Sequence, residues 1–428
     1  MKETSGKIKE NTINFLKKYS LFDKNNVLLV GFSGGPDSLC LLDVLFQLGL
    51  KPVAAHLNHN WRPEEALVEQ EKARQYCNER NIEFYTETLP PGLPQTEEEA
   101  RNQRYSFFNR ITEKIHATAI LTGHTATDNV ETILYRIIKG TGITGLKGIP
   151  EKREQIYRPL LNITRDECNA YCDENALSPS IDSSNYNQKY LRNRLRLSLL
   201  PEMRTYNPEV DTSLLRLSEI AREADEIIQE CVKKTGILNN VIKTQDFLNL
   251  SQPLQKRVLA DYFTQNDIEY TFERINDLFC FIQENKQSKS GKTFTIGKNL
   301  WFFVSSKEMK LINKEPLAEF PELKIKEWKD GVPEKFPEEA AHTIFADLSR
   351  VKQPIYLRTR KPGDIIQPFG MKEKTKLKKY LINRGIPQYQ RDNIPLLVDD
   401  EEILWVVGIG MSELLRVEKI PTHVITVN

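Results

Sequence analysis

Residues 27–38 constrain the fold more than any other part of this chain. They read VLLVGFSGGPDS, an apolar run rich in β-forming residues that leads into a loop with two adjacent glycines. Apolar residues then recur at helical spacing from Leu39 to Phe46. The segment therefore predicts a strand, a tight turn and the start of a helix within about twenty residues.

The loop at 33–38 has the chemistry of an anion site. Its glycines allow a sharp turn and close approach to a ligand, and the new helix presents unpaired N–H groups at the positive end of its dipole. Phosphate is the usual occupant of such a turn. No lysine follows the glycines, so the G-x-x-x-x-G-K-[ST] loop is excluded, and the spacing is not G-x-G-x-x-G. Attack at an α-phosphorus, with pyrophosphate leaving, is favoured over γ-phosphoryl transfer. An ordinary glycine turn capped by serine is the alternative.

Composition sets the class of protein. The chain has 428 residues, 39% hydrophobic and 28% charged, which is too long for one core and typical of globular proteins. No apolar run approaches the ~18–20 residues of a membrane span, and the polar N-terminus has no signal core. We expect a cytoplasmic protein without membrane contact, whose six cysteines are free thiols.

Strand-like and helix-like segments alternate through the first 200 residues. This alternation predicts an α/β fold with an N-terminal Rossmann-like parallel sheet and helices on both faces. A mainly helical middle domain and a small mixed α+β C-terminal domain are expected to follow. The expected domains are 1–206, 207–340 and 345–428, with a connector helix at 210–234 and an irregular linker at 315–340. The first helix is expected at 11–19.

Ligands bind such sheets at the carboxyl ends of the strands. The loop at 33–38, the segment 56–62 and Gly123-His124 all follow expected strands, so they share one rim. Asp128 and Glu131 stand three apart at a helix start and project from one face, where they suit Mg²⁺ or a cationic amine. A solvated carboxylate pair, stabilised by the helix dipole, is the alternative.

Two basic clusters stand out in a chain of net charge +1. Arg192 and Arg196 lie one helical turn apart, with Arg194 between them, and suit an α-phosphate or an RNA backbone. A solvated helix face is the alternative. Residues 358–384 carry nine Lys or Arg against two acidic residues, which argues for a polyanionic partner.

Together these segments resemble the tRNA(Ile)-lysidine synthetase family of PP-loop ATP pyrophosphatases, nearly from end to end. Besides the loop, the N-terminal matches are His56-x-x-His59-x-x-Arg62, Arg101-x-x-Arg104-Tyr105, His124-x-x-x-Asp128-x-x-Glu131-Thr132, Gly140-x-Gly142-x-x-Gly145, Arg158-Pro159-Leu160-Leu161, Asp182-x-Ser184-Asn185 and Tyr190-x-Arg192-Asn193-Arg194-x-Arg196. The C-terminal matches are Arg358-x-Arg360-Lys361-Pro362-Gly363-Asp364, Pro368-x-Gly370-Met371, Ile386-Pro387 and Arg391-Asp392-x-x-Pro395.

The resemblance implies a PP-loop (HUP-type) fold and a ligase that forms a carbon–nitrogen bond. Its implied substrates are ATP with Mg²⁺, free L-lysine and an isoleucine tRNA with a CAU anticodon. ATP adenylates O2 of the wobble cytidine and pyrophosphate leaves; the ε-amine of lysine then attacks C2 and expels AMP. The product, lysidine, pairs with A and not G, so codon reading changes from AUG to AUA.

The resemblance also implies roles for single residues. ATP is assigned to Ser33, Gly34, Gly35, Pro36, Asp37, Ser38 and His56, with Asp37 as the candidate Mg²⁺ ligand. Lysine is assigned to Asp128, Glu131 and Arg104, and which carboxylate meets lysine rather than metal stays open. The catalytic set is Asp37, Asp128, Glu131, Arg192 and Arg194. The expected tRNA contacts are Arg192, Arg196, Arg360, Lys376, Lys378 and Lys379.

Three rival interpretations were weighed against this one. A PP-loop tRNA thiolase needs paired cysteines or an iron–sulfur cluster, and no cysteine cluster falls on the rim. An amidotransferring ligase has no use for the basic C-terminal segment. A nucleotide-sensing RNA-binding protein does not need two rim carboxylates. One departure from the family pattern is Thr125-Ala126-Thr127, where more polar neighbours of His124 are expected. The sequence leaves open whether two copies form a homodimer.

Overall fold

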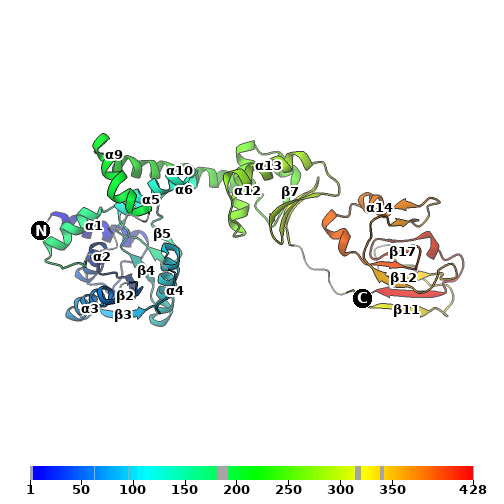
Figure 1. Cartoon of the computed structure of the whole chain (residues 1–428), viewed down its shortest axis with the longest axis horizontal. Helices are drawn as coiled ribbons and strands as arrows, with labels where there is room; N and C mark the ends of the chain where they lie inside the picture. The colour runs from blue at the N-terminus through cyan, green and yellow to red at the C-terminus, as the bar shows by residue number, and fades with distance from the viewer. Residues whose placement is uncertain are drawn as a thin grey trace. The chain divides into compact units, whose positions relative to one another are not determined.

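The computed structural model describes residues 3–61, 63–94, 96–180, 191–313, 320–337 and 342–427. The chain divides into two compact units, residues 1–228 and 229–428, and each is described by itself. Figure 1 shows their elements in order from blue to red. In the part described, no helix is long and apolar enough to cross a membrane.

Unit 1 is built on a six-stranded sheet with the order β3-β2-β1-β4-β6-β5. Its first five strands in that order are parallel, and β5 pairs antiparallel with β6 at the edge. The strands are β1 (Val27–Gly31), β2 (Lys51–Asn58), β3 (Glu83–Thr88), β4 (Ala119–Thr122), β5 (Lys152–Arg153) and β6 (Ile156–Tyr157). This arrangement confirms the predicted parallel sheet.

Side chains of β1 alternate between two cores because successive residues of a strand point to opposite faces. Leu28 and Val30 join the core made with helices α1 (Glu3–Lys18), α2 (Pro36–Gln47), α3 (Pro63–Glu79) and α7 (Arg165–Glu174). Leu29 joins the opposite core, which contains Phe107 and Phe108 of α4 (Glu97–Ile115). Both faces of the sheet are therefore covered, as the apolar strand sequence requires.

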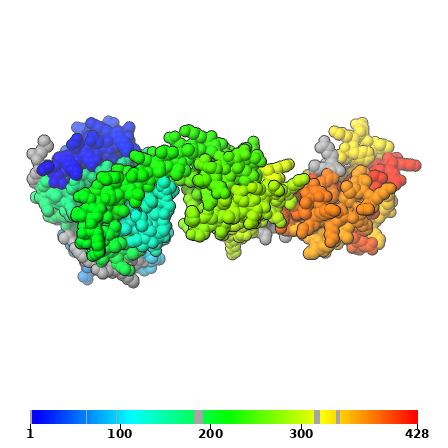
Figure 2. Space-filling model, turned by 90° about the horizontal axis from the view of Figure 1, so that it is seen from above, coloured from blue at the N-terminus to red at the C-terminus, as the bar shows by residue number. Residues whose placement is uncertain are grey.

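A third core joins helix α5 (Ala126–Lys139) to residues 191–214. That stretch runs through α8 (Leu191–Arg194), a π-helix (Leu195–Leu199) and α9 (Leu200–Tyr206) into the long helix α10 (Val210–Thr235). The short helix α6 (Ile143–Leu146) lies between α5 and the β5–β6 hairpin in the chain. In Figure 2 the surface of unit 1 carries segments coloured from blue to green, so residues near 200 belong to the same body as the first strands.

Unit 2 begins with helices packed on an antiparallel sheet of order β7-β10-β9-β8. Its elements are α11 (Thr244–Leu248), α12 (Gln252–Gln265), α13 (Phe272–Asn285), β7 (Val241–Lys243), β8 (Lys292–Gly297), β9 (Leu300–Val304) and β10 (Glu308–Asn313). Three small antiparallel sheets follow, with α14 (Leu377–Asn383) beside them. Their strands are β11 (Leu323–Glu327), β12 (Thr343–Ala346), β13 (Tyr356–Arg358), β14 (Ile365–Ile366), β15 (Thr375–Lys376), β16 (Leu396–Val398), β17 (Ile403–Val406), β18 (Gly410–Met411) and β19 (His423–Val427).

Two local predictions were wrong. Helix α1 begins at Glu3 rather than near residue 11, because Ser5 and Ile8 are also buried. The expected linker at 315–340 contains strand β11, which pairs with β19 across the register Ile325↔Ile425. Charged residues on both sides of Ile325 hid the strand, since an edge strand needs few apolar side chains.

Candidate active site

The loop after β1 is held in shape by its own side chains. Gly34 has φ +83°, a conformation that favours glycine. The Ser33 and Ser38 hydroxyl oxygens lie 3.0 Å apart, the Gly35 N–H donates to Ser33 Oγ at 3.3 Å, and Ser38 Oγ donates to the Gly35 carbonyl at 3.1 Å. The two serines therefore fix the shape of the loop.

Helix α2 starts without a side-chain cap. Its N-cap residue, Gly35, makes no capping hydrogen bond, and Pro36 follows at the first turn. Helices α5 and α7, by contrast, each begin with a complete capping box, Thr125 with Asp128 and Thr164 with Glu167. The first N–H groups of α2 therefore stay available for an anion.

Gly123 keeps the start of α2 close to strand β4. A Cβ atom built at Gly123 would lie 2.9 Å from the backbone carbon of Asp37 and from the backbone nitrogen of Ser38. Only glycine fits this approach without displacing the main chain of α2. The Gly123-His124 segment thus meets the loop at the rim, as the sequence predicts.

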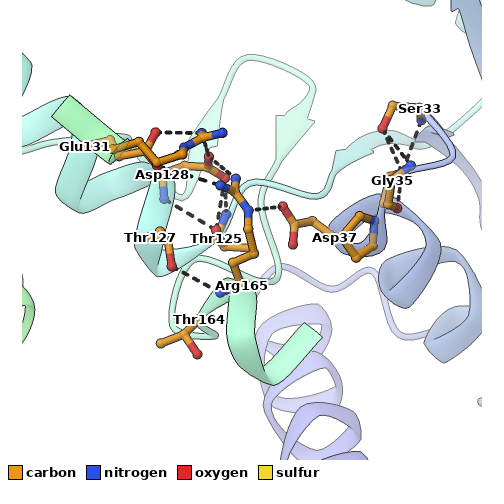
Figure 3. A network of polar contacts seen from close by, with 12 residues as sticks. Ser33, Gly35, Asp37, Thr125, Thr127, Asp128, Glu131, Thr164 and Arg165 are labelled. Carbon is orange, nitrogen blue, oxygen red and sulfur yellow. Dashed lines mark hydrogen bonds and ion pairs between the residues drawn. The ribbon is translucent and has the colours of Figure 1, made fainter. Parts of the chain in front are cut away.

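One guanidinium group connects the loop to the carboxylate helix (Figure 3). Arg165, the first residue of α7, donates from Nε to Asp37 Oδ2 at 3.1 Å and from Nη2 to Asp128 Oδ1 at 2.9 Å. Its Nη1 lies 3.7 Å from Glu131 Oε1. Asp37, Asp128 and Glu131 therefore converge on one point, although they come from two different helices.

The three arginines of the first basic cluster have different surroundings. Arg196 binds both oxygens of Glu131, at 2.6 and 2.8 Å, and the Glu131 side chain is completely buried. Arg192 donates to Thr132 Oγ1 at 2.8 Å. Arg194 is exposed. The structure thus brings Arg192 and Arg196 to the carboxylate helix and turns Arg194 to solvent.

Burial and charge act in opposite directions on the two aspartates. Burial raises the pKa of Asp37 to about 6, even though Arg165 favours the ionised form. For Asp128 burial also raises the pKa, but Arg165 and the hydrogen bonds from Thr125 outweigh it and the net shift is downward. Asp37 Oδ1 is buried and has no hydrogen-bond partner among the residues that the structure describes.

That orphaned oxygen fits a magnesium ligand. Mg²⁺ is usually held by one or two carboxylates together with substrate phosphates and water. Among the described residues, no group of three or more His, Cys, Asp or Glu forms a protein-only metal cage. Asp37, beside the uncapped start of α2, therefore suits an ion that arrives with a nucleotide.

Histidines and Arg104 line the rim beyond β2. His56 is buried, and its Nδ1 lies 2.9 Å from the Phe32 carbonyl oxygen, so its ring fastens β2 to the end of β1. His59 is partly buried, and neither of its ring nitrogens has a hydrogen-bond partner in the described part of the chain. Burial, with a contribution from Arg104, lowers the pKa of His59 to about 4. Arg104 thus lies near enough to act on the rim electrostatically, with its side chain exposed.

This histidine predicts a pH dependence of stability. The unfolded chain binds a proton on His59 near pH 6.5, while the folded chain does so only near pH 4. Between these values the unfolded state holds more protons, so the free energy of unfolding falls as the pH falls. A His59→Phe variant should show a shallower loss of melting temperature between pH 6.5 and 4.5. His116→Asn, at an exposed position, is the control and should follow the parent chain; an equal slope in both variants would contradict the assignment.

The second basic cluster is partly neutralised. Arg358 pairs with Asp364 at 2.8 Å, Arg360 with Asp392 at 2.6 Å, and Lys374 with Glu402. Lys376, Lys378 and Lys379 lie at β15 and the start of α14, and all three are exposed. Lys361, Lys372, Lys374 and Arg384 are exposed as well, so most of the cluster is displayed to solvent. Four predicted motif residues (Arg62, Asp182, Ser184, Asn185) and Tyr190 lie outside the described residues.

Arg165 is the site residue that the sequence analysis missed. Its only local signal is its position, because a cation at the first turn of a helix opposes the dipole. Its partners stand 128, 37 and 34 positions away in the chain, so no local pattern reports them.

Comparison with known proteins identifies the family. The PP-loop domain model matches residues 5–203, and the TilS substrate C-terminal domain model matches residues 355–424. A tRNA(Ile)-lysidine synthase from Clostridium perfringens is 31% identical, over 96% of this chain and 96% of its own length. This chain belongs to the tRNA(Ile)-lysidine synthase family.

Other lysidine synthases match equally far along the chain. The enzyme of Clostridioides difficile is 31% identical over 98% of both chains. That of Bacteroides thetaiotaomicron is 32% identical over 98% of this chain and 99% of its own. The predicted family resemblance is confirmed, and the PP-loop domain marks the chain as a user of ATP. The thiolase alternative is not favoured.

Proposed function

We propose that this chain ligates free L-lysine to C2 of the wobble cytidine in a CAU-anticodon isoleucine tRNA, at the expense of ATP. The observation that supports this most directly is the uncapped start of α2 beside three carboxylates and Arg165. Phosphates suit the first feature and a cationic amine suits the second. A site with both can serve a reaction that joins an amine to a nucleotide-activated base.

The proposed reaction has two balanced steps. O2 of the cytosine attacks the α-phosphorus of ATP, and the bond to pyrophosphate breaks. The uncharged ε-amine of lysine then attacks C2, the C2–O2 bond breaks, and AMP leaves with that oxygen. The amine loses its protons to solvent or to a rim carboxylate on the way.

The chain's residues divide this work. The loop at 33–38 and the first N–H groups of α2 hold the phosphates, and His56 supports the loop through Phe32. Bound Mg²⁺, with Asp37 as its protein ligand, would offset negative charge on the pyrophosphate leaving group. Asp128 faces the ammonium of lysine, with Arg104 nearby. Glu131, whose oxygens Arg196 already binds, acts by holding that arginine.

Exchange of labelled pyrophosphate into ATP tests the first step, and labelled lysine tests the second. We expect exchange only with the CAU-anticodon isoleucine tRNA transcript, followed by lysine label in the RNA. Exchange without lysine in the RNA would point to another nucleophile. It would then favour an amidotransferring ligase or a tRNA thiolase. No exchange at all would favour a binding protein. Gel filtration of the pure chain would test the homodimer.

The middle and last domains are proposed to bind the body of the tRNA, and the exposed lysines predict how. Replacing Lys376, Lys378 and Lys379 with glutamine should weaken tRNA binding. Each lost phosphate contact should also reduce the salt dependence of binding by roughly one unit of log–log slope. Filter binding from low to high salt measures both effects.

A matched triple variant controls for net charge. Lys24, Lys51 and Lys114 are also exposed, but they precede β1, β2 and β4 or lie at their starts, at the opposite end of the sheet from the rim. Their replacement with glutamine should leave the salt slope unchanged. Equal slopes in both triple variants would overturn the assignment of the C-terminal lysines.

A further inference from the structure

Arg165 meets its three carboxylates with three different nitrogen atoms. Nε faces Asp37, Nη2 faces Asp128 and Nη1 faces Glu131, at 3.1, 2.9 and 3.7 Å. The planar fork of a guanidinium group can make such divergent contacts, whereas a lysine ammonium is a single point charge on a flexible stem. The identity of this residue therefore matters as well as its charge.

The main chain of Arg165 is fixed independently of its side chain. Thr164 and Glu167 form the capping box of α7, and the Arg165 N–H donates to Thr127 Oγ1 at 3.1 Å. A cation at the first helical position is unfavourable to the helix itself. The Arg165 side chain thus stabilises the carboxylates and does not stabilise helix α7, to which it belongs.

The charges of the cluster do not balance. Asp37, Asp128 and Glu131 face two guanidinium groups, those of Arg165 and Arg196. With all five groups ionised, one negative charge is left over, and it is the charge that Mg²⁺ at Asp37 would meet. Only a quarter of the Arg165 side chain is exposed, so water screens this excess weakly.

We propose that Arg165 is a positioning residue that ties the nucleotide loop to the carboxylate helix and so sets where the substrate amine meets Asp128. The proposal rests on the proposed function, since it takes lysine to be the amine. Asp37 belongs to the nucleotide side and Asp128 to the amine side, so a single side chain sets the spacing between the two half-sites.

Two variants separate this role from a merely structural one. Arg165→Met removes the positive charge, so the cluster should attract the lysine ammonium more strongly while losing its alignment. We expect the KM for lysine to fall several-fold and kcat to fall on the order of 10²-fold. Arg165→Lys keeps the charge but not the fork, so kcat should fall about tenfold with little change in the KM for lysine.

The measurements use the full chain with the tRNA transcript and labelled lysine, and Arg110→Met is the control. Arg110 is an exposed arginine of α4 paired with Glu87, and its loss should change neither constant. A purely structural role would lower kcat through the folded fraction and leave the KM for lysine unchanged in Arg165→Met, which would overturn the proposal.

The outcomes remain distinguishable if a variant misfolds or the function differs. If Arg165→Met does not fold, Arg165→Lys decides: the fall in kcat supports the proposal, and a parental kcat refutes it. If the parent chain places no lysine in the RNA, the proposed function fails instead. Pyrophosphate exchange in the same samples then shows whether the nucleotide half-site still works.

Discussion

Replacing Asp37 with alanine should strongly reduce pyrophosphate exchange while tRNA binding stays within about twofold of the parent chain. Asp37 Oδ1 is a buried carboxylate oxygen that has no partner among the described residues, and Oδ2 receives the Arg165 contact. Removing both takes away the candidate metal ligand and one anchor of the guanidinium. Losses of 10²–10³-fold, on the order seen when one electrostatic stabiliser is removed, are expected.

Asp37→Asn refines this test because it keeps the shape and removes the charge. Asp173→Ala, at an exposed position of α7, is the matched control and should exchange pyrophosphate at the parental rate. Circular dichroism must show the parental spectrum for each variant. Turnover retained in Asp37→Ala would remove Asp37 from the catalytic set.

Replacing Arg196 with methionine should destabilise unit 1 by about 3–5 kcal/mol, because it leaves the buried Glu131 carboxylate without its two-point partner. For a unit of this size, that corresponds to a fall in melting temperature of roughly 10 °C or more. Scanning calorimetry of the full chain would show the loss in the transition of unit 1. The pair joins α5 to the helical segment after residue 190, so both elements should loosen together.

The adjacent helix offers a matched control. Arg204 pairs with Asp211 at 2.6 Å, but on the surface, where such pairs contribute about 0–1 kcal/mol. Arg204→Met should therefore melt close to the parent. Adding Glu131→Leu to Arg196→Met should recover part of the stability, since an apolar pair can replace a buried ion pair. A large loss in Arg204→Met, or none in Arg196→Met, would contradict this account.

The fold of unit 1 follows from short-range patterns in the sequence. The apolar run at 27–31 had to be buried on both faces, and the helix starts carried capping residues such as Thr96 and Thr125. Each of these signals lies within a few residues of the element that it specifies. Strand β11 was missed because its signal is a partner about a hundred positions away, β19.

The site could be predicted only in part, for the same reason. The sequence places Asp128 and Glu131 on one helix face, but not that Asp128 caps its own helix while Glu131 faces inward to Arg196. Arg196 and Arg165 reach these carboxylates from 65 and 37 residues away. Such pairs are set by tertiary packing, which no window of sequence contains.

The uncapped start of α2 has a consequence for how this enzyme tolerates change. The phosphate binding proposed for it depends on main-chain N–H groups, so replacing serines one at a time should leave most of that binding in place. Alanine scanning of the side chains would therefore underestimate the contribution of the loop to phosphate binding. A substitution that changes the path of the backbone should disrupt this binding. Gly34 is such a position, because its φ of +83° is strained for any residue with a side chain.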